Sequence, residues 1–458
     1  MYHKTRNIHF VGIGGMGMSG IAEVLLTLGH HVTGSDLADN VQTKRLASLG
    51  AKVFHGHLPQ QVHGADVLVI SSAVNEQNIE VCEAKRLSIP VIPRAEMLAE
   101  LMRLKTSVAV AGAHGKTTTC SAIGMLLTQA GLDPTLVIGG KLKNLGVNAR
   151  LGQGELMVAE ADESDGSFLL LSPTVTVVTN IDREHMNYYR DLDHLIETFL
   201  TFINRVPFYG VSILCTDDPH IRALLGRVKK RVITYGFSDA QITPANVTPV
   251  GLGQTYDLIR NGQKLTEIAI NQPGSHNVLN SLAAAAVGLE LGLTPAEVAE
   301  GLRLFKGAGR RFEIKGTAGG VTLIDDYGHH PTEIKATLST LAKCFPGCRR
   351  VILFQPNRFT RTKNLFDEFA VTFDLADVLY LTDIYPAGEQ PLEGVNSERL
   401  TQAIINRGHP KAKYLGTLKQ MPELAMEEIR EGDVVMTLGS GNIGQICEEL
   451  LRRLAERK

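Results

Sequence analysis

The chain has few cysteines, no long apolar run and almost no net charge. Its six cysteines are scattered over 458 residues, which excludes the disulfide framework of a small secreted domain. No uninterrupted apolar run approaches the ~20 residues that a membrane-spanning helix needs, and the first residues lack the apolar core of a signal peptide. A formal net charge of −2 provides no broad surface for nucleic acid. We therefore expect a cytoplasmic protein with no nucleic-acid partner and no integral membrane contact.

Short β-branched apolar runs alternate with amphipathic helical stretches along the whole chain. This order is typical of parallel α/β sheets. It recurs in three series and predicts an α/β protein with three domains: a Rossmann-like domain (1–104), a central domain with a phosphate-binding loop (105–316) and a second Rossmann-like domain (317–458). Asn261-Gly262 interrupts the second series and predicts a β-hairpin, because both positions tolerate positive φ.

A glycine-rich loop follows the first apolar run. Gly12, Gly14 and Gly17 match G-x-G-x-x-G, and an acid, Asp36, follows ~20 residues later. Taken alone, this pattern favours a dinucleotide-binding dehydrogenase. Its glycines nevertheless permit close approach of any pyrophosphate, so another nucleotide fits equally well.

The strongest motif is AGAHGKTT at 111–118, which lies between an apolar strand and a helix. Backbone N–H groups of such a loop surround phosphate oxygens, the lysine reaches the β- and γ-phosphates, and a threonine hydroxyl ligates Mg²⁺. The loop is shorter than G-x-x-x-x-G-K-[ST], since Val110 stands where the first glycine is usual. The residues expected to bind ATP here are Gly112, Ala113, His114, Gly115, Lys116, Thr117 and Thr118.

Polar clusters follow most of the later strands. Four acids lie within residues 160–165, and the segment 180–185 ends in His185. A carboxylate and an imidazole from these segments can share a divalent ion with the phosphates. In the third series, clusters at 325–331, 355–362 and 383–389 cap consecutive strands. Two phosphate loops with a single lysine indicate one nucleotide as energy source and a second as a handle on the substrate.

Together these motifs resemble the Mur ligase family over essentially the whole chain. The segments that carry the resemblance are GIGGMGMSG (12–20), AGAHGKTTT (111–119), EADESDGSF (160–168), TNIDREHMNYY (179–189), PGSHNVLNSLAA (273–284), GAGRRFE (307–313), DDYGHHPTEI (325–334), FQPNRFTRT (354–362), DIYPAGE (383–389) and GSGNIG (439–444). The resemblance implies an ATP-dependent amide ligase that adds L-alanine to UDP-N-acetylmuramate in peptidoglycan precursor synthesis. ADP and phosphate are released by way of an acyl phosphate.

The resemblance also implies roles for individual residues. The magnesium shell is Thr117 or Thr118, Glu160 and His185. ATP is further bound by Asn277, Asn280 and Asp325. The first loop holds the UDP-sugar through Gly14, Gly15, Met16, Gly17, Met18, Ser19, Asp36, Ser71 and Ser72. L-Alanine is bound by Tyr327, His329, Arg358 and Arg361. The catalytic residues are Lys116, Glu160, His185, Arg311, His329, Arg358 and Arg361.

Three other functions stay open at this point. A recycling ligase would join a whole murein tripeptide to the same UDP-sugar. An NAD-dependent dehydrogenase would use the first loop and leave the motif at 111–119 without a role. A nucleotide sensor would bind ATP without forming product. The chain is compatible with either a monomer or a homodimer.

Overall fold

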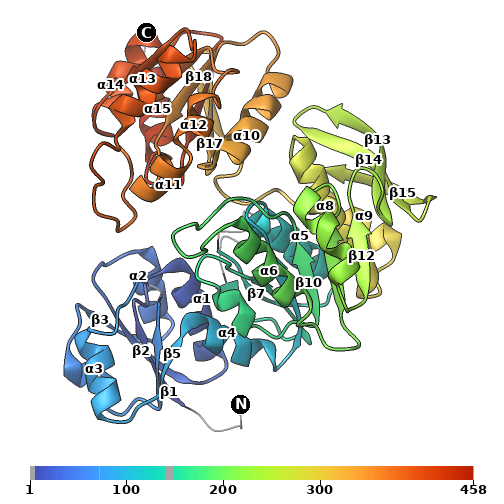
Figure 1. The fold of residues 1–458 in the computed structure, drawn as a ribbon, viewed down its shortest axis with the longest axis vertical. Coiled ribbons are helices and arrows are strands. Elements are labelled where there is room, and N and C mark those ends of the chain that lie inside the picture. The colour runs from blue at the N-terminus through green and yellow to red at the C-terminus, as the bar shows by residue number, and fades with distance from the viewer. Residues whose placement is uncertain (1–5, 72, 140–148, 457–458) are drawn as a thin grey trace. The chain divides into compact units, whose positions relative to one another are not determined.

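The computed structural model describes residues 6–71, 73–139 and 149–456 (Figure 1). It contains three sheets, which confirms the α/β class predicted from the sequence. Chain contacts divide the protein into two compact units, which we describe separately. The first unit comprises residues up to 248 with 254–271 and 277–308, and the second comprises 249–253, 272–276 and the chain from 309.

The first sheet is parallel, with strand order β3-β2-β1-β4-β5. Because the order reverses at β1, the loop after this strand lies where α/β sheets bind ligands. The strands are β1 (Asn7–Val11), β2 (His31–Asp36), β3 (Lys52–His55), β4 (Val67–Ile70) and β5 (Val91–Pro93). The α-helices are α1 (Met16–Thr27), α2 (Val41–Ser48), α3 (Ile79–Arg86) and α4 (Arg94–Met102).

The second sheet has the order β15-β14-β13-β12-β11-β10-β6-β9-β7-β8. Its strands are β6 (Thr106–Ala111), β7 (Thr135–Val137), β8 (Ala149–Arg150), β9 (Leu156–Glu160), β10 (Val175–Val178), β11 (Val211–Cys215), β12 (Val232–Tyr235), β13 (Ile242–Val250), β14 (Gly253–Arg260) and β15 (Gln263–Ile270). Its α-helices are α5 (Lys116–Gln129), α6 (Leu192–Ile203), α7 (Pro219–Leu224), α8 (Ser275–Glu290) and α9 (Pro295–Leu304). The predicted hairpin is confirmed, since β14 and β15 pair antiparallel around Asn261 and Gly262, both with positive φ.

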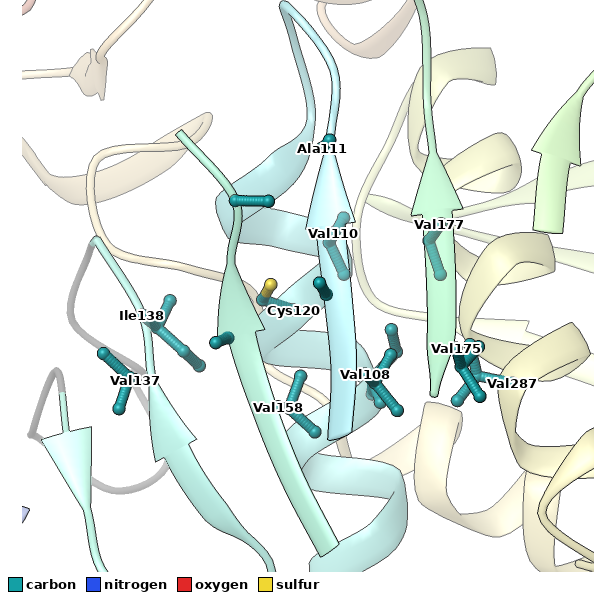
Figure 2. Close-up of a cluster of buried hydrophobic side chains, with 14 of the residues drawn as sticks. Val108, Val110, Ala111, Cys120, Val137, Ile138, Val158, Val175, Val177 and Val287 are labelled. Atoms are coloured by element: carbon teal, nitrogen blue, oxygen red, sulfur yellow. The ribbon is translucent and has the colours of Figure 1, made fainter. Parts of the chain in front are cut away.

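The core of the central sheet consists of mostly apolar strands that are almost completely buried. Figure 2 shows Val108 and Val110 of β6 beside Val158 of β9 and Val175 and Val177 of β10, all at most 3% exposed. Every residue of β10 is buried, as is every residue of β6 after Thr106. Strands buried on both faces read as unbroken apolar runs rather than alternating ones, and that is why these segments are recognisable in the sequence.

The third sheet has the order β16-β17-β21-β18-β19-β20. Its strands are β16 (Glu313–Ala318), β17 (Val321–Asp326), β18 (Arg350–Phe354), β19 (Val378–Leu381), β20 (Ala412–Tyr414) and β21 (Val434–Leu438). Its helices are α10 (Pro331–Cys344), α11 (Phe359–Asn364), α12 (Phe366–Ala370), α13 (Ser397–Asn406), α14 (Met421–Glu428) and α15 (Gln445–Glu456). No helix in the described part of the chain is long and apolar enough to cross a bilayer.

Two features of the third sheet differ from the sequence-based expectation. The antiparallel strand β16 was not expected. The polar clusters after β17 and β18 follow each other along the chain, but the last strand, β21, pairs with both and lies between them.

Candidate active site

The loop between β6 and α5 has a backbone that only glycine accommodates at two positions. Gly112 has φ +133° and Gly115 has φ +83°. A Cβ at Gly112 would lie 2.1 Å from Oγ1 of Thr179, and a Cβ at Gly115 would lie 2.6 Å from Oδ1 of Asn280. Because Lys116 opens α5, the free N–H groups of the first turn, which includes Thr117 and Thr118, border this loop and form an anion-binding end.

The segment after β10 fixes the same loop from the side. The Asn180 side chain accepts a hydrogen bond from the His114 N–H (2.8 Å) and donates one to the His114 carbonyl (3.0 Å). The Thr179 hydroxyl donates to that carbonyl (2.6 Å), and the backbone N–H of Ala113 donates to the Asn180 carbonyl (3.2 Å). The His114 ring lies 2.9 Å from Asp182. Residues at the end of β10 and directly after it therefore hold the loop in shape.

Lys116 is the cation of the site. Its Nζ donates to the Gly112 carbonyl (2.5 Å) and to both carboxylate oxygens of Glu163 (2.8 and 2.9 Å). Burial acts to lower the pKa of Lys116, but the charges of Glu163 and Asp162 outweigh it, so this pKa is raised and the ammonium persists. Nε2 of His185 lies 3.7 Å from Glu163.

Glu163, which is 1% exposed, is a site residue that the sequence did not single out. It belongs to the acid cluster at 160–165, in which one-dimensional spacing gives no reason to prefer one carboxylate over another. Glu160 ends β9 in register with Val110, and Gly139 leaves room for it, since a Cβ there would lie 2.6 Å from Oε2 of Glu160. The charge of Glu160 also raises the pKa of Lys116, although by less than Glu163 does.

The two asparagines predicted to bind ATP lie on α8 and are almost buried. Oδ1 of Asn280 accepts a hydrogen bond from the Thr119 hydroxyl (3.2 Å), and its amide donates to Asn277 (3.3 Å). Asn280 also occupies the space beside Gly115. The structure therefore brings Asn280 against the phosphate loop, with Asn277 beside it, and α8 contributes to that loop's shape.

A cavity of about 800 Å³ opens at the carboxyl end of β1. It is lined by Gly12, Gly14, Gly15, Asp36, Leu37, Asn40, His57, Ser71, Ala73, Val74, Asn75, Gln77, Asn78 and Ile79. The carboxylate of Asp36 accepts hydrogen bonds from the N–H groups of Gly14 (2.8 Å) and Ala38 (3.0 Å).

The UDP-sugar residues predicted from the sequence divide into three groups. Gly14, Gly15, Asp36 and Ser71 line the cavity. Met16, Gly17, Met18 and Ser19 form the first turn of α1, where Met18 and Ser19 are buried. Ser72 lies outside the described residues. His57 and Asn78 line the cavity but were not predicted, because no local motif marks them.

In the second unit, the side chains of Arg310 and Arg311 make different contacts. The guanidinium of Arg310 donates to Asp325 (2.8 Å) and to the carbonyls of Gly439 and Gly441 (2.7 and 2.9 Å). Asp325 is 2% exposed and also accepts from the Thr437 hydroxyl (2.8 Å), so its buried carboxylate is paired with a partly exposed guanidinium. Arg311 lies over the ring of Tyr327 (4.9 Å to the centroid) and 3.5 Å from Glu333.

Tyr327 and His329 follow β17 and contact each other edge to face, with ring centroids 5.5 Å apart. Nδ1 of His329 lies 3.0 Å from the Tyr327 carbonyl, and its backbone N–H donates to Glu333 (3.0 Å). The structure therefore brings Arg311, Tyr327 and His329 together after β17.

His276 lies in the same unit. Burial and, to a smaller extent, the charge of Arg311 lower the pKa of His276 to about 4.

Arg358 directly precedes α11, the first helix after β18, and Arg361 lies in the first turn of that helix. Arg358 has φ +66° and lies 3.4 Å from Glu389, which also accepts hydrogen bonds from the backbone and hydroxyl of Thr360 (3.0 and 2.6 Å). Arg361 donates to the Asn357 side chain (2.7 Å). Because β21 separates β17 from β18, the 439–442 loop lies between this arginine pair and the Tyr327 cluster.

Comparison with known proteins covers the whole chain. Three family models match: "Mur ligase family, catalytic domain" (7–106), "Mur ligase middle domain" (110–288) and "Mur ligase, glutamate ligase domain" (310–441). A UDP-N-acetylmuramate–L-alanine ligase of Syntrophobacter fumaroxidans is 54% identical, with 99% of this chain and 97% of that protein covered.

Two solved structures share the fold over nearly the full length. The UDP-N-acetylmuramate–alanine ligase of Thermotoga maritima is 28% identical with a TM-score of 0.83, and the alignment covers 99% of this chain and 100% of that one. A murein peptide ligase of Psychrobacter arcticus is 22% identical with a TM-score of 0.72, at 99% coverage of both chains.

Proposed function

The chain belongs to the Mur ligase family, and from this premise we propose that it is the ATP-dependent ligase that adds L-alanine to UDP-N-acetylmuramate. The 54% identity to a ligase of that name over nearly the whole of both chains supports this substrate choice over a murein tripeptide. The observation that carries the enzymatic reading is Lys116, held as a largely buried cation at the head of α5 beside two acids. A dehydrogenase would leave this arrangement without a task.

The reaction has two steps in this proposal. A carboxylate oxygen of the UDP-sugar attacks the γ-phosphorus of ATP, ADP leaves, and an acyl phosphate results. The L-alanine amine then attacks the acyl carbon, phosphate leaves, and the amine loses a proton as the amide forms. Lys116 offsets the negative charge that develops on the phosphoryl oxygens in the first step.

The residues present fit a magnesium ion next to the phosphate loop. Carboxylates and hydroxyls are the hard oxygen donors that Mg²⁺ prefers, and Glu160, Thr117 and Thr118 supply them close to Lys116. We propose that Glu160, His185 and one of the two threonines hold the ion. Bound there, it would neutralise phosphate charge.

Each sheet-bearing domain takes one substrate in this proposal. The domain at 1–104 binds the UDP-sugar in the cavity beside Asp36, and the domain at 105–316 binds ATP through its phosphate loop together with Asn277 and Asn280. The domain at 317–458 binds the L-alanine carboxylate through Arg358 and Arg361, with Tyr327 and His329 beside the amine. Asp325 is a further contact for ATP, Arg311 is a cation for the acyl phosphate, and the reaction runs in the cytoplasm, where ATP is available.

Phosphate release from ATP tests the proposal directly. Mg²⁺, ATP and UDP-N-acetylmuramate are supplied, and each amino acid and a murein tripeptide are added in turn. We expect release that requires both the UDP-sugar and L-alanine, with the mass of one alanine residue added to the sugar. Release with tripeptide alone would instead identify the recycling ligase, and ATP binding without any product would identify a sensor.

A further inference from the structure

A buried acid lies directly behind the cavity of the first domain. Glu80 is 0% exposed, as are its neighbours His9 and Ser35. Oε1 of Glu80 lies 3.3 Å from Nε2 of His9, while Oε2 lies 2.9 Å from Nδ1 of His57 and accepts a hydrogen bond from the Ser35 hydroxyl (2.5 Å). Of these residues, His57 lines the cavity.

The start of α3 does not depend on this cluster for its cap. Glu80 lies in the first turn of α3, whose N-terminus is already capped by the side chain of Asn78. Taking a carboxylate out of water is costly, and apolar residues of similar volume commonly serve a core equally well. Burial acts to raise the pKa of Glu80, but hydrogen bonds from His9 and Ser35 outweigh it, so the pKa is lowered and the carboxylate stays ionised.

An ionised acid at this position determines what His57 presents to the cavity. Because the carboxylate only accepts hydrogen bonds, it keeps a proton on Nδ1 of His57 and fixes the orientation of the ring. The remaining nitrogen is then the single polar group that the ring offers to a ligand. Acids that orient a ligand-binding histidine in this way typically change affinity ~10- to 100-fold when they are removed from metal sites.

We propose that Glu80 is a positioning residue for UDP-sugar binding, which it supports through His57, with Ser35 and His9 fixing its two oxygens. The inference rests on the proposed function, because it takes the cavity to be the site of a uridine diphosphate. Glu80 itself does not line the cavity. Its effect on the ligand is therefore indirect and requires His57.

A double-mutant cycle measured with UDP tests this role in the full chain. Glu80→Gln, His57→Ala and the double variant are titrated with UDP by calorimetry, and the KM values for UDP-N-acetylmuramate and ATP are measured beside kcat. Glu83→Gln is the matched control, because Glu83 lies on the same helix and also pairs with a histidine, His63 (2.8 Å), but lines no part of this cavity.

We expect Glu80→Gln to weaken UDP binding about 10-fold and to raise the KM for the UDP-sugar by a similar factor. The KM for ATP and kcat should stay within about twofold of the wild-type values. In the His57→Ala background the same change should add almost nothing, and Glu83→Gln should bind UDP like the wild type. The role would be overturned if the affinity losses of the two single variants multiplied in the double variant. It would also be overturned if Glu80→Gln left the affinity for UDP unchanged.

Ser35→Ala keeps the test decisive if Glu80→Gln fails to fold, because it keeps every charge and removes both the hydrogen bond to Glu80 and the contact of the Ser35 hydroxyl with Nδ1 of His57 (2.9 Å). It should weaken UDP binding by a smaller factor of about three, and unaltered UDP binding would overturn the role. If the wild-type chain turns over UDP-N-acetylmuramate and the variants bind UDP as tightly as it does, the role of Glu80 is wrong but the proposed function stands. If the wild-type chain neither binds UDP nor turns over UDP-N-acetylmuramate, both the role of Glu80 and the proposed function are wrong.

Discussion

At the scale of single residues, the site depends on charges whose partners lie far away in sequence. Lys116 is paired with Glu163, and both are largely withdrawn from water. His185 lies within 3.7 Å of the same carboxylate. We therefore expect each of these groups to contribute to stability as well as to the proposed chemistry, and substitutions can separate the two contributions.

Lys116→Met should reduce kcat by roughly 100- to 1,000-fold or more, because a cation on the phosphoryl oxygens is lost. It should also destabilise the protein by about 2–3 kcal/mol, less than the ~3–5 kcal/mol of a fully buried broken pair, since His185 remains near Glu163. Denaturant unfolding and phosphate release measure the two effects. Lys116→Met with Glu163→Gln should regain stability but not turnover, and recovery of turnover would contradict the assignment of Lys116.

His276 should make stability depend on pH. Its folded-state pKa is about 4, whereas an unfolded histidine titrates near ~6.5. As the pH falls from about 6.5 to about 4, His276 is protonated in the unfolded chain but stays neutral in the folded chain. Up to about 3 kcal/mol of folding stability is therefore lost in this pH range. Urea unfolding from pH 7 to pH 4 measures this loss. His276→Gln should remove that part of the dependence, and an unchanged pH profile would contradict it.

At the scale of elements, the phosphate loop takes its shape from its neighbours. The end of β10 supplies Thr179 and Asn180, and α8 supplies Asn280. The side chains of Thr179 and Asn280 approach the loop more closely than a Cβ at Gly112 or Gly115 would permit. From this packing we expect the N–H groups of the loop to be held in place before a phosphate binds.

Gly112→Ala should abolish ATP binding, because the new methyl would lie 2.1 Å from the Thr179 hydroxyl and displace the loop. Gly29→Ala is the control: Gly29 has φ +84° but nothing within 4 Å of the added Cβ. It should lose only about 1–2 kcal/mol of stability and bind ATP normally. Fluorescent nucleotide titration compares the two, and equal affinities would show that the loop's close packing is unimportant.

At the scale of the whole molecule, the two units have separate hydrophobic cores. One core runs through the first and second sheets and includes Ile8, Val108 and Leu282. The cores on the two faces of the third sheet include Ile324 and Val351. Units with cores of their own can unfold independently, and two-state behaviour then fails for the chain as a whole.

Scanning calorimetry should therefore resolve two transitions. UDP should shift only the transition of the first unit, because mass action stabilises only the unit that binds the ligand, by ~2.7 kcal/mol at a concentration 100 times Kd. The shift should amount to a few degrees. A single transition that moves as a whole with UDP would show that the units unfold together.

Much of the fold was predictable because its strands are buried on both faces. The run at 108–111 is apolar throughout, the run at 175–178 is apolar apart from Thr176, and Asn261-Gly262 marks a hairpin by its conformational preference. β16 was missed because an edge strand with polar, half-exposed residues carries no such pattern. The insertion of β21 between β17 and β18 was missed because strand order depends on pairing across about a hundred residues of sequence.

The sequence by itself determined the α/β class, the two glycine-rich loops and the lysine of the phosphate site, because each depends on a local rule of burial, backbone conformation or helix start. Only the tertiary structure decided which acid pairs with Lys116, that Arg310 is taken by Asp325, and that Glu80 lies behind His57. Those pairings join side chains on separate elements, and a carboxylate is assigned its partner by distance in space, which linear spacing does not contain.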